Sequence, residues 1–487
     1  MIRTFAATLL ACTAAHAAAA APTFEPDLAS LRAVPRVELP AAAVAKALAA
    51  REKGRPYQYA VPVDFALRGT DGAWATRAGA AHWRLRLRSA EARSLSLYLP
   101  RGALPAGASL WVYDPAAQHA YGPFDATRAG GIWTPPLSGD ELVLEVRSAT
   151  GEPVALEPGT VRAFHGFRGW KSHLDPDAGA GACNIDVTCP SASAWAADAG
   201  AVARISIGGT SLCSGQLVNN VRQDKRRLFL TANHCGIGGA TGPDDSVMFY
   251  FNYTGACGDG DHDPLPAPTF QGSDLLARDL QSDFTLVEIS DGATALPAGT
   301  FFAGWDATGE VASGGAAIHH PSGDEKKIAF HDVTPVRDTI DIGLACRIDA
   351  WRVQWSSGTT EGGSSGGGLW DASHRLIGVL TGGLASCDTP SGADYFARLE
   401  RAWTANAAPG GQLKAHLDPD GTCVAIVPRL DPATSPGPVA ATGTNQLCTG
   451  PASSCKSGGG GGGGGFGAFG AYALLVLLGA VLGRRRA

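Results

Sequence analysis

The stretch Thr360-Glu361-Gly362-Gly363-Ser364-Ser365-Gly366-Gly367-Gly368-Leu369-Trp370 places two serines between two runs of glycine. Glycine adopts backbone conformations that other residues avoid. Such a loop can therefore expose one hydroxyl while neighbouring backbone N–H groups point toward a single place. That arrangement suits a nucleophilic serine with donors for a developing oxyanion. Gly/Ser-rich loops are also common plain connections, so the interpretation depends on partners elsewhere in the chain.

Two partners precede this loop. The apolar run Arg227-Leu228-Phe229-Leu230-Thr231-Ala232-Asn233-His234-Cys235 predicts a strand that ends in a histidine. In Ser282-Asp283-Phe284-Thr285-Leu286-Val287-Glu288-Ile289, an aspartate begins a second strand, where its carboxylate can accept a hydrogen bond from imidazole Nδ1–H. We therefore predict a catalytic triad of His234, Asp283 and Ser365, with the backbone N–H groups of Gly363 and Ser365 as the oxyanion hole.

Three further motifs accompany these: Gly181-Ala182-Cys183-Asn184-Ile185-Asp186-Val187-Thr188-Cys189-Pro190, Ser214-Gly215-Gln216-Leu217-Val218-Asn219-Asn220 and Ala317-Ile318-His319-His320-Pro321. Through all these motifs, residues from about 181 to 405 resemble the bacterial lysyl endopeptidases, a secreted branch of the chymotrypsin-like serine proteases. The resemblance implies an all-β fold of two antiparallel β-barrels with the active site between them. It also implies an endopeptidase that cleaves protein or peptide substrates after lysine and needs no cofactor.

The resemblance assigns substrate specificity to Asp394, in Ser391-Gly392-Ala393-Asp394-Tyr395-Phe396. A pocket for lysine or arginine needs a buried carboxylate, because a desolvated cation without a counter-charge is very unfavourable. Asp388 is a second candidate, and an exposed turn is the alternative role for Asp394. Thr381 stands where the best-known family members have a histidine. A trypsin-like enzyme that cleaves after either basic residue therefore stays an alternative.

One position differs from the trypsin pattern. Trypsin-type enzymes carry an aspartate directly before the nucleophile, and this aspartate pairs with a freshly cut N-terminal amine. The corresponding residue here is Ser364, which has no charge. We therefore expect activation that does not depend on insertion of a new N-terminus. His319 and His320 belong to the family pattern but not to its triad, and we interpret both as structural.

The chain has 487 residues, 45% of them hydrophobic, and a formal net charge of −6. It can therefore form more than one domain, and it lacks the basic excess of a nucleic-acid-binding protein. Residues 1–21 are typical of a secretory signal peptide. Leu9-Leu10-Ala11-Cys12 also resembles a lipoprotein cleavage box, but the apolar run before it is unusually short.

Ten cysteines remain when Cys12 is set aside, and an even number in an exported chain predicts disulfides. The family resemblance implies three pairs: Cys183 with Cys387, Cys189 with Cys257, and Cys213 with Cys235. The remaining pairs follow by elimination: Cys346 with Cys423, and Cys448 with Cys455. We expect no metal site, because Cys-x-x-Cys clusters with histidines are lacking, and Asp259-Gly260-Asp261-His262-Asp263 lacks the spacing of a calcium loop.

Residues 22–171 differ in composition from the protease region. Runs such as Trp83-Arg84-Leu85-Arg86-Leu87-Arg88 and Glu141-Leu142-Val143-Leu144-Glu145-Val146 alternate with period two, which predicts a small antiparallel β-sandwich. We interpret it as a propeptide, with a retained binding module as the alternative. A polar, Gly/Pro-containing junction at residues 166–181 suits a cleaved linker.

Residues 172–424 form the predicted protease domain. Strand-length apolar runs occur at 201–207, 247–251 and 376–380, and only residues 395–403 show a helical period.

The tail begins with a Pro/Gly-rich linker at residues 425–465 and ends in residues 466–487. An uncharged apolar run at 466–483 is followed by Arg484-Arg485-Arg486. This resembles the C-terminal sorting signals of Gram-negative secreted proteins. We expect a transient membrane anchor, with a permanent transmembrane helix as the alternative.

Taken together, the sequence predicts a secreted or cell-surface serine endopeptidase zymogen that is monomeric. One rival is an inactive protease fold that serves as a surface binding protein, but all three triad residue types are present. A lipase or esterase is disfavoured, because those enzymes place the acid and the histidine after the serine.

Overall fold

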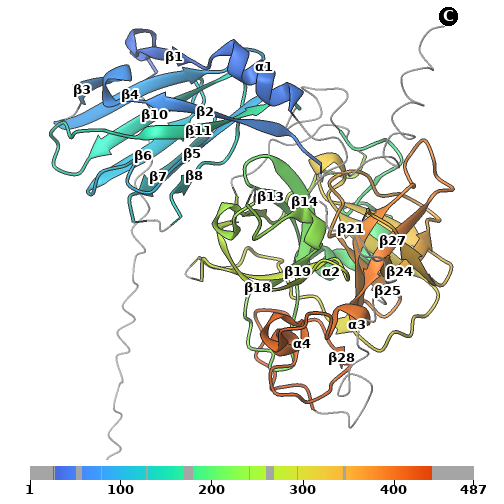
Figure 1. Cartoon of the computed structure of the whole chain (residues 1–487). Helices are drawn as coiled ribbons and strands as arrows, with labels where there is room; N and C mark the ends of the chain where they lie inside the picture. Colours follow the sequence, from blue (N-terminus) through green and yellow to red (C-terminus); the bar gives the residue numbers. More distant parts are fainter. Residues whose placement is uncertain are drawn as a thin grey trace, which may run out of the picture.

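The computed structural model describes residues 26, 28–50, 57–77, 79–127, 130–168, 179–240, 242–258, 268–292, 294–343 and 347–440. It consists of an N-terminal β-sandwich followed by a larger unit built around two further sheets (Figure 1). Strands dominate both parts, and the helices are short. The predicted all-β fold, with a β-sandwich ahead of a chymotrypsin-like pair of antiparallel sheets, is confirmed.

Two sheets form the N-terminal sandwich. The six-stranded sheet contains β1 (Arg36–Glu38), β3 (Ala73–Arg77), β4 (Ala80–Arg88), β6 (Ala108–Tyr113), β7 (Ala120–Asp125) and β10 (Glu141–Ser148). The five-stranded sheet contains β2 (Ala60–Leu67), β5 (Ser94–Leu99), β8 (Ile132–Trp133), β9 (Leu137–Ser138) and β11 (Gly159–Gly166).

The alternating residues of β4 and β5 bury one face of each strand between these sheets. Leu85 and Leu87 are fully buried, and Leu95 and Leu97 are nearly so. They belong to one hydrophobic core. One pairing differs from the antiparallel prediction, since β1 lies parallel to β4. The chain between these two strands includes α1 (Ala41–Ala49), β2 and β3, which is long enough for a parallel crossover.

The first protease sheet has seven strands in the order β17, β16, β13, β14, β15, β19, β18. Their bounds are β13 (Val202–Ile207), β14 (Ser211–Leu217), β15 (Leu228–Thr231), β16 (Met248–Tyr250), β17 (Phe270–Gln271), β18 (Ser273–Asp279) and β19 (Phe284–Ile289). β15 and β19 are antiparallel neighbours, with Thr231 opposite Thr285. The end of β15 therefore lies beside the start of β19.

The second protease sheet has ten strands. They are β12 (Ile185–Asp186), β20 (Trp305–Asp306), β21 (Gly315–His319), β22 (Lys327–His331), β23 (Val336–Ile340), β24 (Ile348–Gln354), β25 (Gly368–Asp371), β26 (Leu376–Gly383), β27 (Ala393–Arg398) and β28 (Ile426–Val427). A buried core that includes Leu230, Leu286, Ile318 and Trp370 joins the two protease sheets.

Short helices connect these strands. The α-helices after α1 are α2 (Ala196–Ala201), α3 (Leu399–Ala402) and α4 (Lys414–Leu417). The 3-10 turns are η1 (Leu31–Ala33), η2 (Gly69–Asp71), η4 (Pro190–Trp195), η5 (Asn233–Cys235), η6 (Asp244–Ser246), η7 (Pro321–Gly323) and η8 (Pro409–Gly411).

The helical period at residues 395–403 was misleading as a sequence signal. Its first half is strand β27, which pairs with both β24 and β26, and only its second half is helix α3. Strand pairing on both sides satisfies the backbone of β27, so sheet context overrides the local period.

The residues after 424 begin as part of the protease unit. β28 pairs with β20, Leu430 is buried, and the Val439 N–H donates to the Val221 carbonyl at 2.8 Å. The signal peptide (1–21) and the apolar tail (466–483) both lie outside the described residues.

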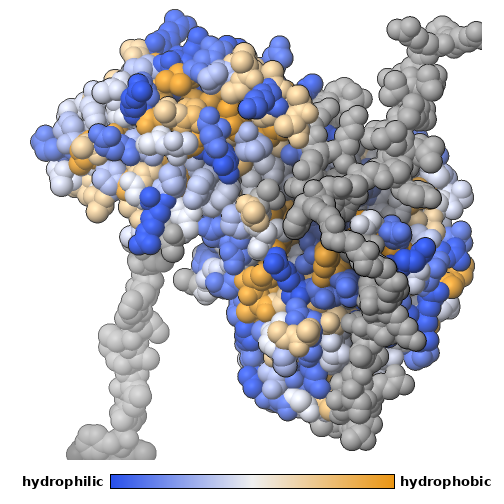
Figure 2. Space-filling view, in the orientation of Figure 1, coloured by the Kyte–Doolittle hydropathy of each residue, from blue (hydrophilic) through white to orange (hydrophobic). Residues whose placement is uncertain are grey.

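The surface of the described part is largely hydrophilic. Only six large hydrophobic side chains are exposed in the described ranges, and Figure 2 shows orange hydrophobic residues gathered in small groups among hydrophilic ones. A search of the described helices finds none with the length and apolar character needed to span a bilayer.

Candidate active site

His234 and Asp283 form a closely held pair. His234 Nδ1 lies 2.9 Å from Asp283 Oδ2, and the His234 backbone N–H donates to Asp283 Oδ1 at 2.9 Å. The pairing of β15 with β19 produces this contact, since His234 follows the first strand and Asp283 precedes the second. The carboxylate therefore holds the proton on Nδ1 and leaves Nε2 available as a base.

The environment of Asp283 is unusual for a loop residue. Its side chain is fully buried, and its backbone φ is +46°. Aspartate is one of the few residues that tolerate the left-handed region, and such conformations gather at functional sites. This backbone turn directs both carboxylate oxygens toward His234.

Two opposing effects set the pKa of the His234 imidazole. Burial, the largest single effect, lowers this pKa, whereas the charge of Asp283 and its hydrogen bond raise it. The net pKa lies above the ordinary value of 6.5. Asp283 therefore stabilises the imidazolium that forms when His234 accepts a proton.

The Ser365 loop packs against the strand that leads to His234. The Ser214 N–H of β14 donates to the Ser365 carbonyl at 2.8 Å, and that carbonyl oxygen lies 3.8 Å from Cys235 Sγ. Gly366 has a φ of +79°, and a side chain there would collide with Thr231 Oγ1 and the Ser214 carbonyl. Glycine is therefore required for this approach. The main chain of Ser365 therefore lies beside Cys235, the residue that follows His234.

Two backbone donors remain available beside Ser365. Within the described part of the chain, the N–H groups of Gly363 and Ser365 donate to no protein acceptor. The neighbouring Ser364 and Gly366 N–H groups are satisfied, by the Glu361 carbonyl at 3.0 Å and the Leu380 carbonyl at 2.9 Å. Such a pattern leaves two donors for an oxyanion, as the sequence predicts.

Ser364 has a partner that the sequence did not identify. Its Oγ lies 2.8 Å from His319 Nδ1, and it accepts the Glu361 N–H at 3.1 Å. Burial lowers the pKa of His319 to about 3, so the imidazole is neutral and Nδ1 can accept the hydroxyl proton. The hydrogen bond to His319 thus holds Ser364, and with it the nucleophile loop, in place. A buried serine hydroxyl needs a hydrogen-bond partner, and this need was the signal that could have pointed to a polar neighbour such as His319.

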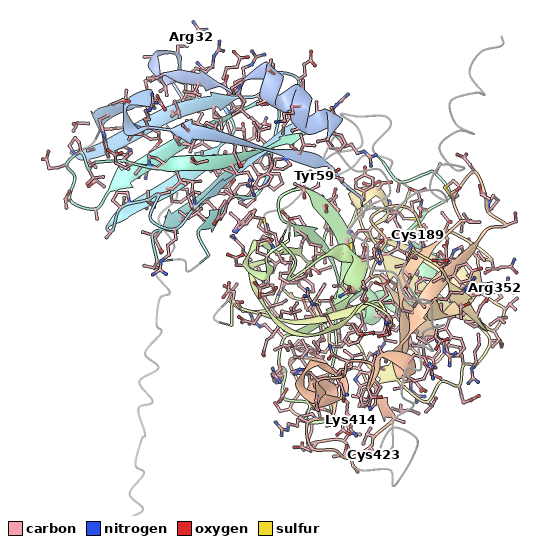
Figure 3. The ribbon with its side chains drawn as sticks, viewed as in Figure 1. Arg32, Tyr59, Cys189, Arg352, Lys414 and Cys423 are labelled. Atoms are coloured by element: carbon pink, nitrogen blue, oxygen red, sulfur yellow. A yellow bond between two sulfur atoms is a disulfide. The ribbon has the colours of Figure 1, made fainter. Side chains whose placement is uncertain are left out.

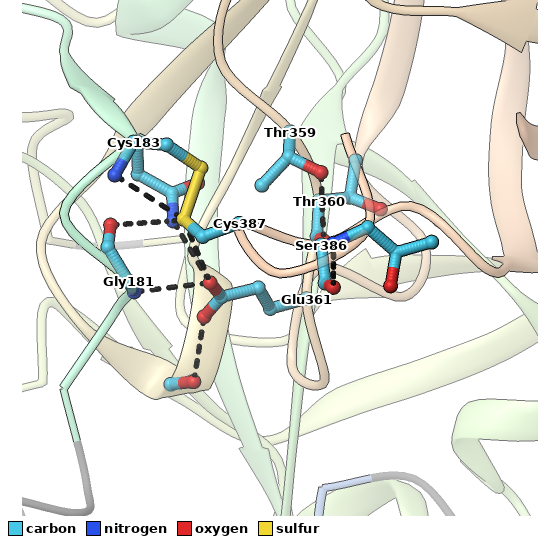
Figure 4. Close-up of a disulfide and its surroundings, with 10 residues drawn as sticks. Gly181, Cys183, Thr359, Thr360, Glu361, Ser386 and Cys387 are labelled. Carbon is cyan, nitrogen blue, oxygen red and sulfur yellow. Dashed lines mark hydrogen bonds between the residues drawn. A yellow bond between two sulfur atoms is a disulfide. The ribbon is translucent and has the colours of Figure 1, made fainter. Parts of the chain in front are cut away.

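Glu361 ties this loop to the segment that follows the N-terminal domain (Figure 4). Its Oε1 accepts the Gly181 N–H at 3.0 Å and Asn184 Nδ2 at 3.1 Å, while the Ser322 hydroxyl donates to Oε2 at 3.1 Å. The Cys183–Cys387 disulfide fixes the same segment covalently. These contacts exist in the uncut chain, so the loop is held before any new N-terminus forms.

Asp394 lies in β27 and is 1% exposed. Its Oδ2 accepts hydrogen bonds from Trp355 Nε1 and Thr360 Oγ1, both at 2.7 Å, and its Oδ1 accepts the Ala385 N–H at 3.3 Å. Among the described residues it forms no ion pair, and burial raises its pKa to about 6. A side chain at Gly383 would collide with this carboxylate. Asp388, the second candidate, is exposed.

A cation that reached Asp394 would meet a carboxylate that already has hydrogen-bond donors but, among the described residues, has no counter-charge. Because the described residues provide no cation, an incoming ammonium or guanidinium would favour the charged form of Asp394. Asp394 is therefore a buried carboxylate without a cationic partner among the described residues.

The three disulfides in the described residues are those that the resemblance implies: Cys183–Cys387, Cys189–Cys257 and Cys213–Cys235. Cys423 is also disulfide-bonded. Its predicted pairing with Cys346 therefore stays a prediction, as does the pairing of Cys448 with Cys455. No group of three or more possible ligands in the described ranges could hold a metal ion, and residues 259–263 lie outside them.

Comparison with known proteins supports this arrangement. Residues 178–397 match the family model described as "Lysyl endopeptidase, C-terminal domain". A lysyl endopeptidase of Pseudomonas aeruginosa is 33% identical over 288 residues, an alignment that covers 54% of this chain and 60% of that protein. The chain thus spans less than two thirds of this relative's length.

Solved protease structures give weaker matches. Protease Anisep from Arthrobacter nicotinovorans has 18% identity and a TM-score of 0.31, covering 44% of this chain and 93% of that chain. A protease from M. tuberculosis in its active form has 18% identity and a TM-score of 0.29, covering 43% and 79%. Because these scores are low, the assignment rests on the sequence match. Residues 178–397 are thus similar to the C-terminal domain of the lysyl endopeptidases.

Proposed function

We propose that this protein is a secreted serine endopeptidase that hydrolyses peptide bonds after basic residues, with lysine preferred. The observation that carries the proposal is the hydrogen-bonded His234–Asp283 pair, whose neighbour Cys235 has its Sγ 3.8 Å from the Ser365 carbonyl oxygen. Two unused backbone donors beside Ser365 support the same reaction. The preference for a basic residue rests on the buried, unpaired carboxylate of Asp394.

The reaction follows from the chemistry of these groups. Ser365 Oγ attacks the substrate carbonyl while His234 Nε2 accepts its proton, and Asp283 stabilises the imidazolium. The Gly363 and Ser365 N–H groups receive the oxyanion. Protonated His234 then gives its proton to the leaving amine, and an acyl-enzyme remains on Ser365. Water, activated by the same imidazole, releases the acid product and restores the hydroxyl.

Specificity between lysine and arginine depends on the length and hydrogen bonding of the basic side chain above Asp394. Thr381 is buried and does not supply the imidazole expected at its position. Cleavage after both basic residues therefore stays the alternative. An inactive binding protein is the second alternative. Burial of the Asp283 carboxylate is unfavourable for folding, and an inactive protein would have no catalytic use for it.

We propose further that residues 22–171 act as a propeptide and that the linker after residue 168 is cut during maturation. Export through residues 1–21 and transient membrane anchoring through residues 466–483 belong to the same proposal, with the enzyme as a monomer. These features rest on the sequence patterns described above.

Residues added ahead of the mature N-terminus are expected to leave activity nearly unchanged. We expect maturation between residues 172 and 181. Because Gly181 already binds Glu361 in the uncut chain, catalytic geometry does not depend on a free amine. A matured enzyme carrying four extra residues at its N-terminus should retain kcat within about twofold. A trypsin-like collapse of activity in the extended form would contradict this account of activation.

The pH dependence of peptide hydrolysis is expected to show an acid limb above pH 6.5. Catalysis needs the neutral imidazole, and the pKa of His234 is raised. Activity should therefore be absent well below this pKa and should appear as the pH rises through it. Replacing Asp283 with asparagine should move the limb to lower pH and lower kcat by about ten-thousandfold. A limb that stays fixed in this variant would exclude His234 as the base.

Covalent labelling tests the proposed chemistry. A fluorophosphonate reagent should modify the folded enzyme once, at Ser365, as mapped by peptide mass spectrometry. The unfolded protein should not react, because an ordinary serine hydroxyl is a weak nucleophile. Labelling of another residue, or equal labelling after unfolding, would contradict the proposal.

A further inference from the structure

The protease unit contains a pocket of about 400 Å³ that none of the proposed catalytic residues lines. Its walls come from two segments, the turn between β25 and β26 and the segment that contains β28. The lining residues are Ser373, His374, Arg375, Ile426, Pro428 and Arg429. Strand β25 has four residues and is therefore about 13 Å long, with the Ser365 loop before it and this turn after it. The pocket is thus separate from the nucleophile.

The two arginines of the pocket have unused hydrogen-bond donors. Arg429 Nη1 lies 3.6 Å from Asp198 Oδ2. Arg375 Nη1 lies 3.8 Å from Asp306 Oδ2. Both distances exceed the length of a hydrogen bond, and in the described ranges neither guanidinium donates to another acceptor. Because both carboxylates are buried and the arginine side chains are 36% and 44% exposed, the cations rather than the aspartates face the pocket.

His374 offers a further polar atom to the pocket. Its Nδ1 lies 2.6 Å from Oδ2 of Asp198, and its ring centroid lies 4.2 Å from that of Trp195. These two contacts hold the imidazole in one orientation. Its Nε2 has no partner among the described residues. That nitrogen can accept from a protonated ligand oxygen or, when the ring is protonated, donate to a charged one.

We propose that this pocket binds a phosphate group. Two guanidinium groups, an imidazole and the Ser373 hydroxyl line it, which is more than the two oxygens of a carboxylate can use. Phosphate has three or four acceptor oxygens and up to two negative charges, and arginine binds it through paired N–H donors. The exposed side chains of Ile426 and Pro428 provide an apolar wall for the organic part of a phosphate ester.

A bound phosphate would link two distant parts of the protease unit. β28 pairs with β20 of the second protease sheet, whereas Leu430 belongs to a core of the first sheet. Between them, Asn219 Nδ2 donates to the Pro428 carbonyl at 2.9 Å. Figure 3 shows Cys423, just before this segment, at the end of the protease unit away from the N-terminal sandwich. Because the ligand would contact both this segment and the β25–β26 turn, it should stabilise the folded state.

Isothermal titration calorimetry of the purified protein with inorganic phosphate tests the site. We expect saturable binding of one phosphate per chain. Arg429→Gln and Arg375→Gln should each weaken binding by about tenfold, because each removes charge-assisted hydrogen bonds. Arg222→Gln is the matched control, since Arg222 is exposed, lies outside the pocket and already donates to Asp420 Oδ2 at 2.8 Å. It should bind phosphate as the native protein does.

Thermal unfolding gives a second readout. Phosphate at about ten times its Kd should raise the unfolding midpoint by roughly 3 °C. In Arg429→Gln the same concentration should give roughly a third of that shift. Acetate at equal ionic strength should give no shift, because a single planar carboxylate cannot engage all the donors.

Phenyl phosphate distinguishes the two sources of the phosphate group. Tighter binding of phenyl phosphate would identify a phosphate ester as the ligand, and tighter binding of inorganic phosphate would identify the free ion. No saturable binding of either compound, equal binding of acetate, or equal weakening by Arg222→Gln would overturn the site. None of these measurements needs peptidase activity, so their failure would leave the proposed function unaffected.

Discussion

Alanine in place of Ser365 is expected to lower kcat for peptide hydrolysis by about a millionfold. The hydroxyl is the proposed nucleophile, and without it the His234–Asp283 pair has no group to activate. The side chain is only half-buried, and its main-chain carbonyl holds the loop to Ser214. The thermal unfolding midpoint should therefore shift little.

The neighbouring serine provides a matched control. Ser364→Ala makes the same chemical change one residue away and removes the hydrogen bonds to His319 and Glu361. It should destabilise the fold by roughly 1–3 kcal/mol, because it leaves buried polar groups unpaired, and should keep measurable activity. Full activity in purified Ser365→Ala enzyme would remove Ser365 from the mechanism.

Replacement of Asp394 by asparagine is expected to lower kcat/KM for lysyl substrates by about a thousandfold. Removing one partner of a buried ion pair typically costs about 3–5 kcal/mol. Asparagine keeps the shape of the side chain, and its amide oxygen can still accept from Trp355 and Thr360, although its NH2 group cannot accept the 3.3 Å hydrogen bond from the Ala385 N–H. Kinetics with lysyl and neutral substrates of otherwise identical sequence would measure the effect.

Asp388→Asn is the control for this variant. Asp388 is exposed and directly follows Cys387 of the Cys183–Cys387 disulfide. It should change kcat/KM less than twofold. Since burial already raises the pKa of Asp394, the neutral amide should leave the stability of the free protein unchanged or higher. Equal losses for lysyl and neutral substrates would show that Asp394 supports the fold rather than specificity.

Local sequence patterns were sufficient to predict the strands on either side of the site and the pairing of His234 with Asp283. The run before His234 and the run after Asp283 are apolar and of strand length, so His234 follows the end of one strand and Asp283 precedes the start of the other. Because pairing of these two strands brings their ends together, the contact followed from the order of motifs. The positive φ of Asp283 could not be predicted, since tertiary contacts determine it.

Contacts between distant segments were harder to predict. His319 was interpreted as structural, but its bond to Ser364 depends on the packing of β21 beneath the nucleophile loop. The pairing of Gln58 with Ser211 could not be predicted, because the residues before β2 carry no motif. An exposed strand edge accepts any extended segment through backbone hydrogen bonds, so its partner leaves little trace in sequence.

The burial of Asp394 shows the same limit. Its sequence context resembles a family motif, yet an aspartate in Ser-Gly-Ala-Asp could equally lie in an exposed turn. Only the pairing of β27 with β24 and β26 shows that its carboxylate is enclosed. The proposed preference for a basic side chain rests on that enclosure.

Digestion of a reduced, unfolded protein mixture with the purified enzyme tests the central claim most directly, with every cut site identified by mass spectrometry. We predict cuts after lysine, fewer after arginine, and none with Ser365→Ala prepared in the same way. Equal cutting after lysine and arginine would reduce the claim to a trypsin-like specificity. Cuts spread over apolar residues, or no cuts at all, would contradict the assignment of Asp394 and Ser365.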